Sequence, residues 1–153
     1  MDPKAFRVEI IRPALKLSGL WSENGEALML GTALAESGLR HLRQIGGGPA
    51  IGFYQVEPAT HDDVLRYLRR SDNKLLKQRI LSASLLEDFP DSRVMLWNLR
   101  YATLIARVKY WMRPEPLPYY EDIEALGRYW KSFYNTSKGA GTVEHFIKAW
   151  QGS

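Results

Sequence analysis

The feature that most restricts the fold is an uncharged run, ALMLGTALA at positions 27–35, that ends at a single acid, Glu36. The small residues within the run allow other helices to approach it closely from several sides. Trp21 and Ser22 precede the run, and Gly38 follows it as a typical helix stop. The sequence therefore predicts a central helix over about 23–37, with Glu36 in its last turn.

Helical spacing continues along most of the chain. Asp2 and Pro3 have the pattern of an N-cap followed by a first-turn proline, and Pro13 is expected to kink or restart that first helix. Apolar residues then recur at intervals of three and four. Further helices are predicted at about 59–70, 73–86, 91–112, 119–133 and 142–151.

One stretch departs from this pattern, GGGPAIGFYQVEP at positions 46–58. Its glycines and proline predict a turn, and AIGFYQV favours a β-strand. We expect one small β-hairpin here. With no repeat or linker, the 153 residues are predicted to form a single mainly α domain (1–153) with a small β-hairpin.

Composition excludes several kinds of chemistry. The chain has no cysteine, which excludes disulfides, thiol catalysis and cysteine-ligated zinc. Its three histidines are scattered, and the GGGP segment is not followed by the Lys-Ser/Thr pair of a phosphate-binding loop. We therefore predict neither a metal site nor a cofactor.

The net charge of +4 suggests an anionic partner, either nucleic acid, an acidic cell-wall glycan or a membrane surface; general solubility is the alternative explanation. No stretch approaches the roughly 20 apolar residues of a membrane span, so no membrane insertion is expected. The N-terminal MDPKAFRVEIIRP lacks the uncharged core of a signal peptide. We therefore expect synthesis in the cytoplasm without a signal peptide.

Glu36 is the strongest candidate for chemistry. A carboxyl at a helix end among apolar residues is partly desolvated, which raises its pKa and keeps it protonated near neutrality. A protonated acid that faces a cleft is what general-acid cleavage of a glycosidic bond requires. The structural alternative is that Glu36 caps the helix or pairs with Arg40 or Arg43.

The residues that follow Glu36 narrow this choice. Glu36-Ser37 closes the predicted helix, GFYQ lies at 52–55 ahead of Pro58, NLRYA lies at 98–102, and FYNTS lies at 133–137. In this order they resemble the lysozyme-like lytic transglycosylases and related phage muralytic domains. That family has a Glu-Ser pair, a Gly-Leu-Met-Gln-like strand and an Ala-Tyr-Asn-x-Gly motif. Here Phe133 replaces the alanine of the last motif, and glycines follow only at 139 and 141.

The resemblance implies a role for each matched residue. Glu36 is the catalytic acid, and six further residues bind substrate: Ser37, Phe53, Tyr54, Gln55, Tyr134 and Asn135. Gln55 hydrogen-bonds an acetamido group, and Phe53 and Tyr54 border the sugar subsites, with one of the two facing the core because neighbouring strand residues alternate. The Tyr134 hydroxyl holds Glu36 or a sugar. Structural alternatives stay open: Ser37 as a cap, Gln55 at the surface, Tyr134 in the core and Asn135 in a turn.

The number of carboxylates separates two reactions. Most glycosidases use two acids, whereas lytic transglycosylases use one glutamate and the acetamido group of the substrate. Between Arg40 and Val56 the chain has no Asp or Glu, and the next acids are Glu57, Asp62 and Asp63. This absence favours transglycosylation over a two-carboxylate muramidase.

The resemblance therefore implies a peptidoglycan-cleaving enzyme that acts on the MurNAc-GlcNAc bond at the bacterial cell wall, phage-derived and serving as a virion or lysis protein. Its partners are peptidoglycan glycan strands, with other virion proteins added if it is a virion component. A catalytically silent structural or glycan-binding virion protein with the same fold is the alternative. A helical nucleic-acid binder is the third candidate, and no nucleic acid is predicted as a partner.

Overall fold

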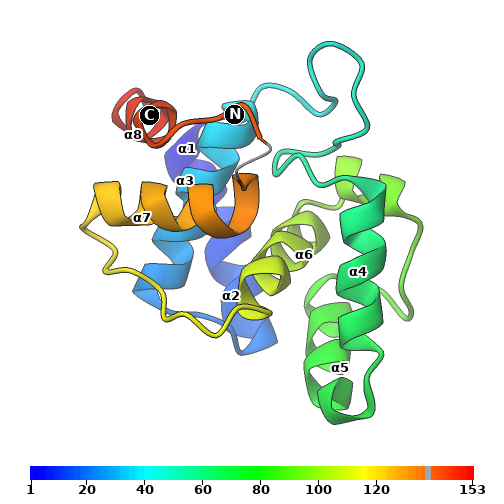
Figure 1. Ribbon diagram of the computed structural model, residues 1–153. Helices are drawn as coiled ribbons and strands as arrows, with labels where there is room; N and C mark the ends of the chain where they lie inside the picture. The colour runs from blue at the N-terminus through cyan, green and yellow to red at the C-terminus, as the bar shows by residue number, and fades with distance from the viewer. Residues whose placement is uncertain (137–138) are drawn as a thin grey trace.

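The computed structural model describes residues 1–136 and 139–153 and is mainly α-helical. Figure 1 shows α3 and α6 in the middle of the molecule, α7 and α8 to one side of them, and α4 and α5 to the other. The α-helices are α1 (Pro3–Phe6), α2 (Arg12–Ser18), α3 (Glu23–Ser37), α4 (Pro58–Leu68), α5 (Lys74–Ala83), α6 (Leu99–Trp111), α7 (Ile123–Trp130) and α8 (Val143–Gln151). Four shorter helical turns are η1 (Arg7–Ile11), η2 (Ser71–Asn73), η3 (Ser92–Leu96) and η4 (Lys131–Asn135).

The predicted start and break of the first helix are confirmed. The Asp2 carboxylate accepts hydrogen bonds from the backbone N–H groups of Lys4 and Ala5, and proline occupies the first turn. The break takes the form of η1, a π-helical turn that ends just before Pro13. Because Pro13 lacks an N–H and its ring crowds the carbonyl four residues earlier, a widened turn at this point relieves the clash.

The predicted central helix over 23–37 is confirmed as α3. Every residue from Gly25 to Ala35 is buried, so the helix is enclosed on all its faces. Gly31 shows why small residues are needed, because a Cβ there would collide with the Phe146 ring of α8. At its C-terminus Gly38 adopts the left-handed conformation and its N–H bonds to the carbonyl of Leu34. This stop places Glu36 in the last turn, where α3 reaches the surface.

The predicted β-hairpin is wrong. Residues 1–136 and 139–153 contain no β-strand, and the segment between α3 and α4 has only isolated bridges, Arg43↔Ile51 and Ile51↔Val56. Ile51 and Val56 exchange two backbone hydrogen bonds of 3.1 and 3.0 Å across a tight turn in which Gly52 and Gln55 have positive φ. Because the chain reverses within six residues, AIGFYQV cannot extend into a strand.

Most of the other helix predictions are confirmed to within a few residues, and one is wrong in its first half. The predicted helix over 91–112 is instead η3 followed by α6. Asn98 separates the two: its side chain accepts from the N–H of Tyr101 as an N-cap and donates to the carbonyl of Ser84. Periodicity alone does not reveal this break, since apolar residues keep their helical spacing through it.

One continuous core contains residues from the first helix to α8, which agrees with the single domain expected from the sequence. Both chain ends lie on the same side of the molecule in Figure 1. The N-terminal amine donates a hydrogen bond of 2.9 Å to the carbonyl of Leu39, just after α3. Among the described residues, no helix is long and apolar enough to cross a membrane.

Candidate active site

A cleft of about 920 Å³ opens where α3 ends. Its lining comes from the C-terminus of α3, the segment after α3, the start of α4, the C-terminus of α6, parts of 130–136 and 139–141, and the start of α8. Of the seven predicted site residues, Glu36, Gln55, Tyr134 and Asn135 line this cleft, and Ser37, Phe53 and Tyr54 do not. The structure thus brings together residues that are separated by up to a hundred positions in the sequence.

Glu36 is mostly buried at the α3 end of the cleft. Burial raises the pKa of its carboxyl from 4.5 to about 7. Three neighbours lower the pKa of Glu36: the positive charge of Lys109, the indole of Trp130 and the amide of Asn135. The carboxyl can therefore hold a proton near neutral pH and can also release it, which is the property of an acid that later acts as a base.

Trp130 contributes an unusual polar group to the site. Its side chain is 1% exposed, and its indole Nε1 has no hydrogen-bond partner of good geometry among the described residues. The indole nevertheless lies close enough to Glu36 to favour the ionised carboxyl. A buried N–H without an acceptor is costly, and an ionised Glu36 supplies the nearest negative charge.

Lys109 lines the same cleft and is fixed there by Tyr134. Its Nζ donates a hydrogen bond of 2.8 Å to the Tyr134 carbonyl and lies 3.9 Å from the centroid of the Tyr134 ring. Burial lowers the pKa of Lys109, while the negative charges of Glu36 and Glu57 raise it. The ammonium is thus held in place by a hydrogen bond and an aromatic face, and the negative charges of Glu36 and Glu57 favour its charged form.

Gln55 reaches the cleft from the tight turn after Gly52. It has a positive φ of 49°, and its Nε2 donates a hydrogen bond of 2.9 Å to the carbonyl of Gly52. This bond fixes the direction of the side-chain amide, so the position of its Oε1 is fixed as well. Gln55 is therefore positioned by a turn, and not by the predicted strand.

Ser37 faces away from the cleft, which corrects its predicted contact with substrate. Its hydroxyl is buried, donates to the carbonyl of Phe53 at 2.7 Å and accepts from the N–H of Leu39 at 3.2 Å. The alternative role as a helix-end cap describes it better. Ser37 joins the end of α3 to the turn that carries Gln55, and so acts on the cleft indirectly.

Phe53 and Tyr54 are both in the core, which corrects their predicted place along the cleft. Phe53 packs edge-on against Phe6 with 5.7 Å between ring centroids, and Tyr54 is 1% exposed with its hydroxyl 3.0 Å from the hydroxyl of Thr103. The prediction that one side chain faces outward assumed the alternation of a strand. In a tight turn that alternation does not apply, and both rings point inward.

Tyr134 and Asn135 lie at the end of η4, the π-helical turn after α7. The Tyr134 hydroxyl donates to the carbonyl of Tyr54 at 2.6 Å, so it does not hold Glu36 as predicted. Asn135 Oδ1 accepts a bond of 2.8 Å from Lys131 Nζ, which also donates to the carbonyl of Gly139. Lys131 thus ties Asn135 to the segment that follows it.

The displaced glycines of this motif have a packing role. A Cβ at Gly139 would collide with Asn135, and a Cβ at Gly141 would collide with the Trp130 ring. Both glycines therefore allow the chain to return closely over the residues around Glu36. Ser137, the last residue of the FYNTS motif, lies outside the described residues.

Other acids are present at the cleft. Glu57 and Asp63 belong to the lining, whereas Asp62 does not. Asp63 forms an exposed ion pair with Arg66. In the two described ranges, no group of three or more His, Cys, Asp or Glu residues is arranged to hold a metal ion.

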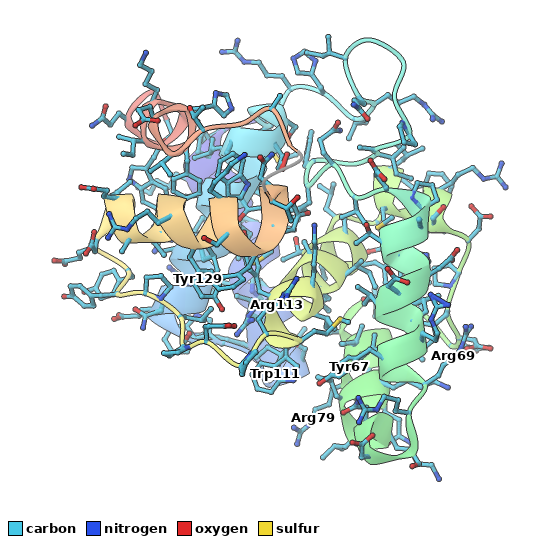
Figure 2. The ribbon with its side chains drawn as sticks, in the orientation of Figure 1. Tyr67, Arg69, Arg79, Trp111, Arg113 and Tyr129 are labelled. Atoms are coloured by element: carbon cyan, nitrogen blue, oxygen red, sulfur yellow. The ribbon has the colours of Figure 1, made fainter. Side chains whose placement is uncertain are left out.

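Sequence reasoning missed Lys109, Trp130 and Arg113. Arg113 lies just past the end of α6, between α7 and α4 in the view of Figure 2, and its guanidinium lies 5.7 Å from the Phe133 ring centroid. Lys109 had only a weak signal, because it and Arg107 are both charges in the otherwise uncharged part of α6 from Tyr101 to Trp111. Trp130 precedes Tyr134 by one helical turn, a spacing that places both on one face.

Comparisons of the chain with protein-family models, curated proteins and solved structures give no match. The chemistry of the cleft residues is therefore the basis for a functional proposal.

Proposed function

We propose that the protein cleaves the MurNAc-GlcNAc bond of peptidoglycan as a lytic transglycosylase, with Glu36 as its single catalytic acid. The observation that carries this proposal is the position of Glu36: a mostly buried carboxyl, with a pKa of about 7, at the edge of a cleft large enough for sugar residues. General acids of glycosidases are tuned in this way by burial.

In the first step, the proton of Glu36 passes to the glycosidic oxygen as the bond between that oxygen and C1 breaks. The acetamido oxygen of the substrate bonds to C1 and takes up the positive charge, and Gln55 is placed to orient that group. In the second step, Glu36, now ionised, removes the proton of the C6 hydroxyl. The C6 oxygen then bonds to C1, the acetamido group is released, and Glu36 is protonated again.

Two-carboxylate hydrolysis is the second candidate, because Glu57 and Asp63 line the same cleft as Glu36. Either would have to activate water on the other face of the sugar or bond to C1. Asp63 is exposed and paired with Arg66, and Glu57 is exposed, whereas Glu36 is mostly buried. The single-acid reaction therefore has more support.

The net charge of +4 favours approach to the anionic bacterial cell wall, where the substrate lies. We place the protein among phage muralytic enzymes, either as a lysis protein or as a virion component. If the protein is instead a catalytically silent glycan-binding protein, the same cleft would bind glycan without cleaving it.

The test is the clearing of purified murein by wild-type protein and by a Glu36→Gln variant. Glutamine keeps the size of the side chain but has no proton to transfer, so activity should fall by at least about a hundredfold. Glu87→Gln, a change at an exposed acid outside the cleft lining, is the matched control and should remain active. Turnover by folded Glu36→Gln at the wild-type rate would reject the mechanism, and an inactive wild-type protein that binds murein would favour the silent alternative.

A further inference from the structure

A single carboxyl that works as both acid and base faces an electrostatic conflict. Burial favours the neutral form of Glu36, which suits the first step, but the second step needs the ionised form in the same place. The carboxyl is mostly buried, so the protein itself must supply much of the stabilisation for the negative charge. The groups packed around Glu36 show where that stabilisation comes from.

Polar and titratable side chains face Glu36 from each element around it. They are Lys109 and Tyr110 of α6, Trp130 of α7, and Tyr134 and Asn135 of η4. His145 of α8 hydrogen-bonds the carbonyl of Ala35, next to Glu36 in the sequence, and lines the cleft. The lining of the cleft also includes His41, Gln55, Glu57, Asp63 and Arg113. Lys109 has the largest effect of all the neighbours that favour the ionised carboxyl.

The position of Lys109 is built by contacts and is not that of a mobile surface lysine. Its Nζ donates to the Tyr134 carbonyl at 2.8 Å and lies over the face of the Tyr134 ring. The same residue, Tyr134, is fixed at its other end by the bond from its hydroxyl to the carbonyl of Tyr54. The ammonium is therefore held at a defined place in the cleft before any substrate arrives.

We propose that Lys109 is a positioning residue for Glu36: its ammonium stabilises the carboxylate that remains when Glu36 gives up its proton, and its bond to Tyr134 holds η4 beside that carboxylate. The proposal rests on the single-acid function described above. Lys109 keeps its own proton throughout, and the proton that moves belongs to Glu36 and then to the C6 hydroxyl. Transfer of the Glu36 proton thus leaves a negative charge in the same cleft as the Lys109 ammonium.

The pKa shifts of Glu36 and Lys109 agree with this role of Lys109. Lys109 opposes the burial that raises the pKa of Glu36, and Glu36 opposes the burial that lowers the pKa of Lys109. Each charge thus makes the other less costly to bury. Without Lys109, Glu36 would be a weaker acid in the first step and would remain protonated to higher pH.

The experiment is an NMR titration of the Glu36 carboxyl in the ligand-free protein, combined with pH profiles of murein cleavage. In Lys109→Met the pKa of Glu36 should rise above its wild-type value, the alkaline limb of the profile should move in the same direction, and kcat should fall by about tenfold or more with a smaller change in KM. Lys109→Arg keeps the charge, so the pKa of Glu36 and the pH profile of cleavage should both stay close to their wild-type values. Lys109→Gln replaces Lys109→Met if the methionine variant does not fold.

Two control variants separate charge from shape. Lys16→Met removes an exposed charge on α2, and Lys131→Met removes the bonds to Asn135 and Gly139. Lys16→Met should leave the pKa of Glu36 unchanged, and Lys131→Met should change it less than Lys109→Met does, because Lys131 acts on Glu36 only through Asn135. An equal shift in Lys131→Met would overturn the proposal, because the effect would then pass through the geometry of η4.

The titration also shows whether the proposed role of Lys109 or the proposed function of the protein is wrong. If wild-type protein cleaves murein and Lys109→Met leaves both the pKa of Glu36 and the pH profile unchanged, the role of Lys109 is wrong and the proposed function stands. If Lys109→Met raises the pKa of Glu36 but wild-type protein cleaves no murein, the electrostatic link is established and the proposed function is wrong.

Discussion

The hydroxyl of Tyr134 donates a hydrogen bond of 2.6 Å to the backbone carbonyl of Tyr54, eighty residues away in the sequence. Both residues are buried. The bond joins η4, which carries Asn135, to the tight turn that carries Gln55. It thus fixes the relative position of two sides of the cleft, and Lys109 uses the same tyrosine as its anchor.

Tyr134→Phe should lower the free energy of unfolding by about 1–3 kcal/mol, because it leaves the buried Tyr54 carbonyl without its donor. Urea denaturation monitored by circular dichroism measures this change. Tyr67→Phe is the matched control, since the Tyr67 hydroxyl forms no hydrogen bond with the described residues and should cost much less. Equal stability of Tyr134→Phe and wild type would show that the bond does not hold the two sides together.

The raised pKa of Glu36 predicts how stability depends on pH. Below pH 4.5 the carboxyl is protonated in both the folded and the unfolded state. Between 4.5 and about 7 the folded state holds a proton that the unfolded state has lost, so stability falls as pH rises through this window. The loss amounts to about 3 kcal/mol and is complete above the folded-state pKa.

The glutamine of Glu36→Gln cannot titrate, so the variant should not lose this stability as pH rises. The variant should therefore gain stability relative to wild type as pH rises from 4.5 to 7, and the difference should be constant above that range. Urea denaturation of both proteins at pH 4, 6 and 8 measures it, and Glu87→Gln controls for the change of net charge. A difference that does not vary with pH would mean that Glu36 is not buried as the structure has it.

Gln55 and the two aspartates of α4 are expected to respond differently to substitution. Gln55 lines the cleft with a fixed amide, whereas Asp62 lies outside the lining and Asp63 is paired with Arg66. Gln55→Ala should therefore reduce murein cleavage by about tenfold or more, while Asp62→Asn and Asp63→Asn retain most activity. Measured rates in the reverse order, with Asp63→Asn or Glu57→Gln inactive, would support a two-acid hydrolase instead.

Those parts of the fold that depend on local signals could be predicted from the sequence. The uncharged run before Glu36 indicated a central helix, and Asp2, Pro3 and Gly38 marked helix ends by their own chemistry. Pro13 indicated a break, although not that a π-helical turn would form there. These features depend on neighbours within one or two turns, which a sequence displays directly.

The parts that depend on distant contacts could not be predicted. The Ile51–Val56 reversal replaces a strand because Gly52 fits closely against the Met95 carbonyl, a contact across more than forty residues. The same reversal turns Phe53 and Tyr54 inward and lets Gln55 reach the cleft. Lys109 and Trp130 meet Glu36 only through packing of α6 and α7 around α3, so the sequence does not show that either lies beside Glu36.

The central claim is that Glu36 acts alone, and mass spectrometry of the products of murein digestion tests it most directly. Internal capture by the C6 hydroxyl yields muropeptides that end in 1,6-anhydro-N-acetylmuramic acid, each one water lighter than the hydrolysis product and resistant to borohydride reduction. Wild-type protein should give these anhydro ends as its main product, and Glu36→Gln should not form them. Reducible N-acetylmuramic acid ends as the main product would contradict it.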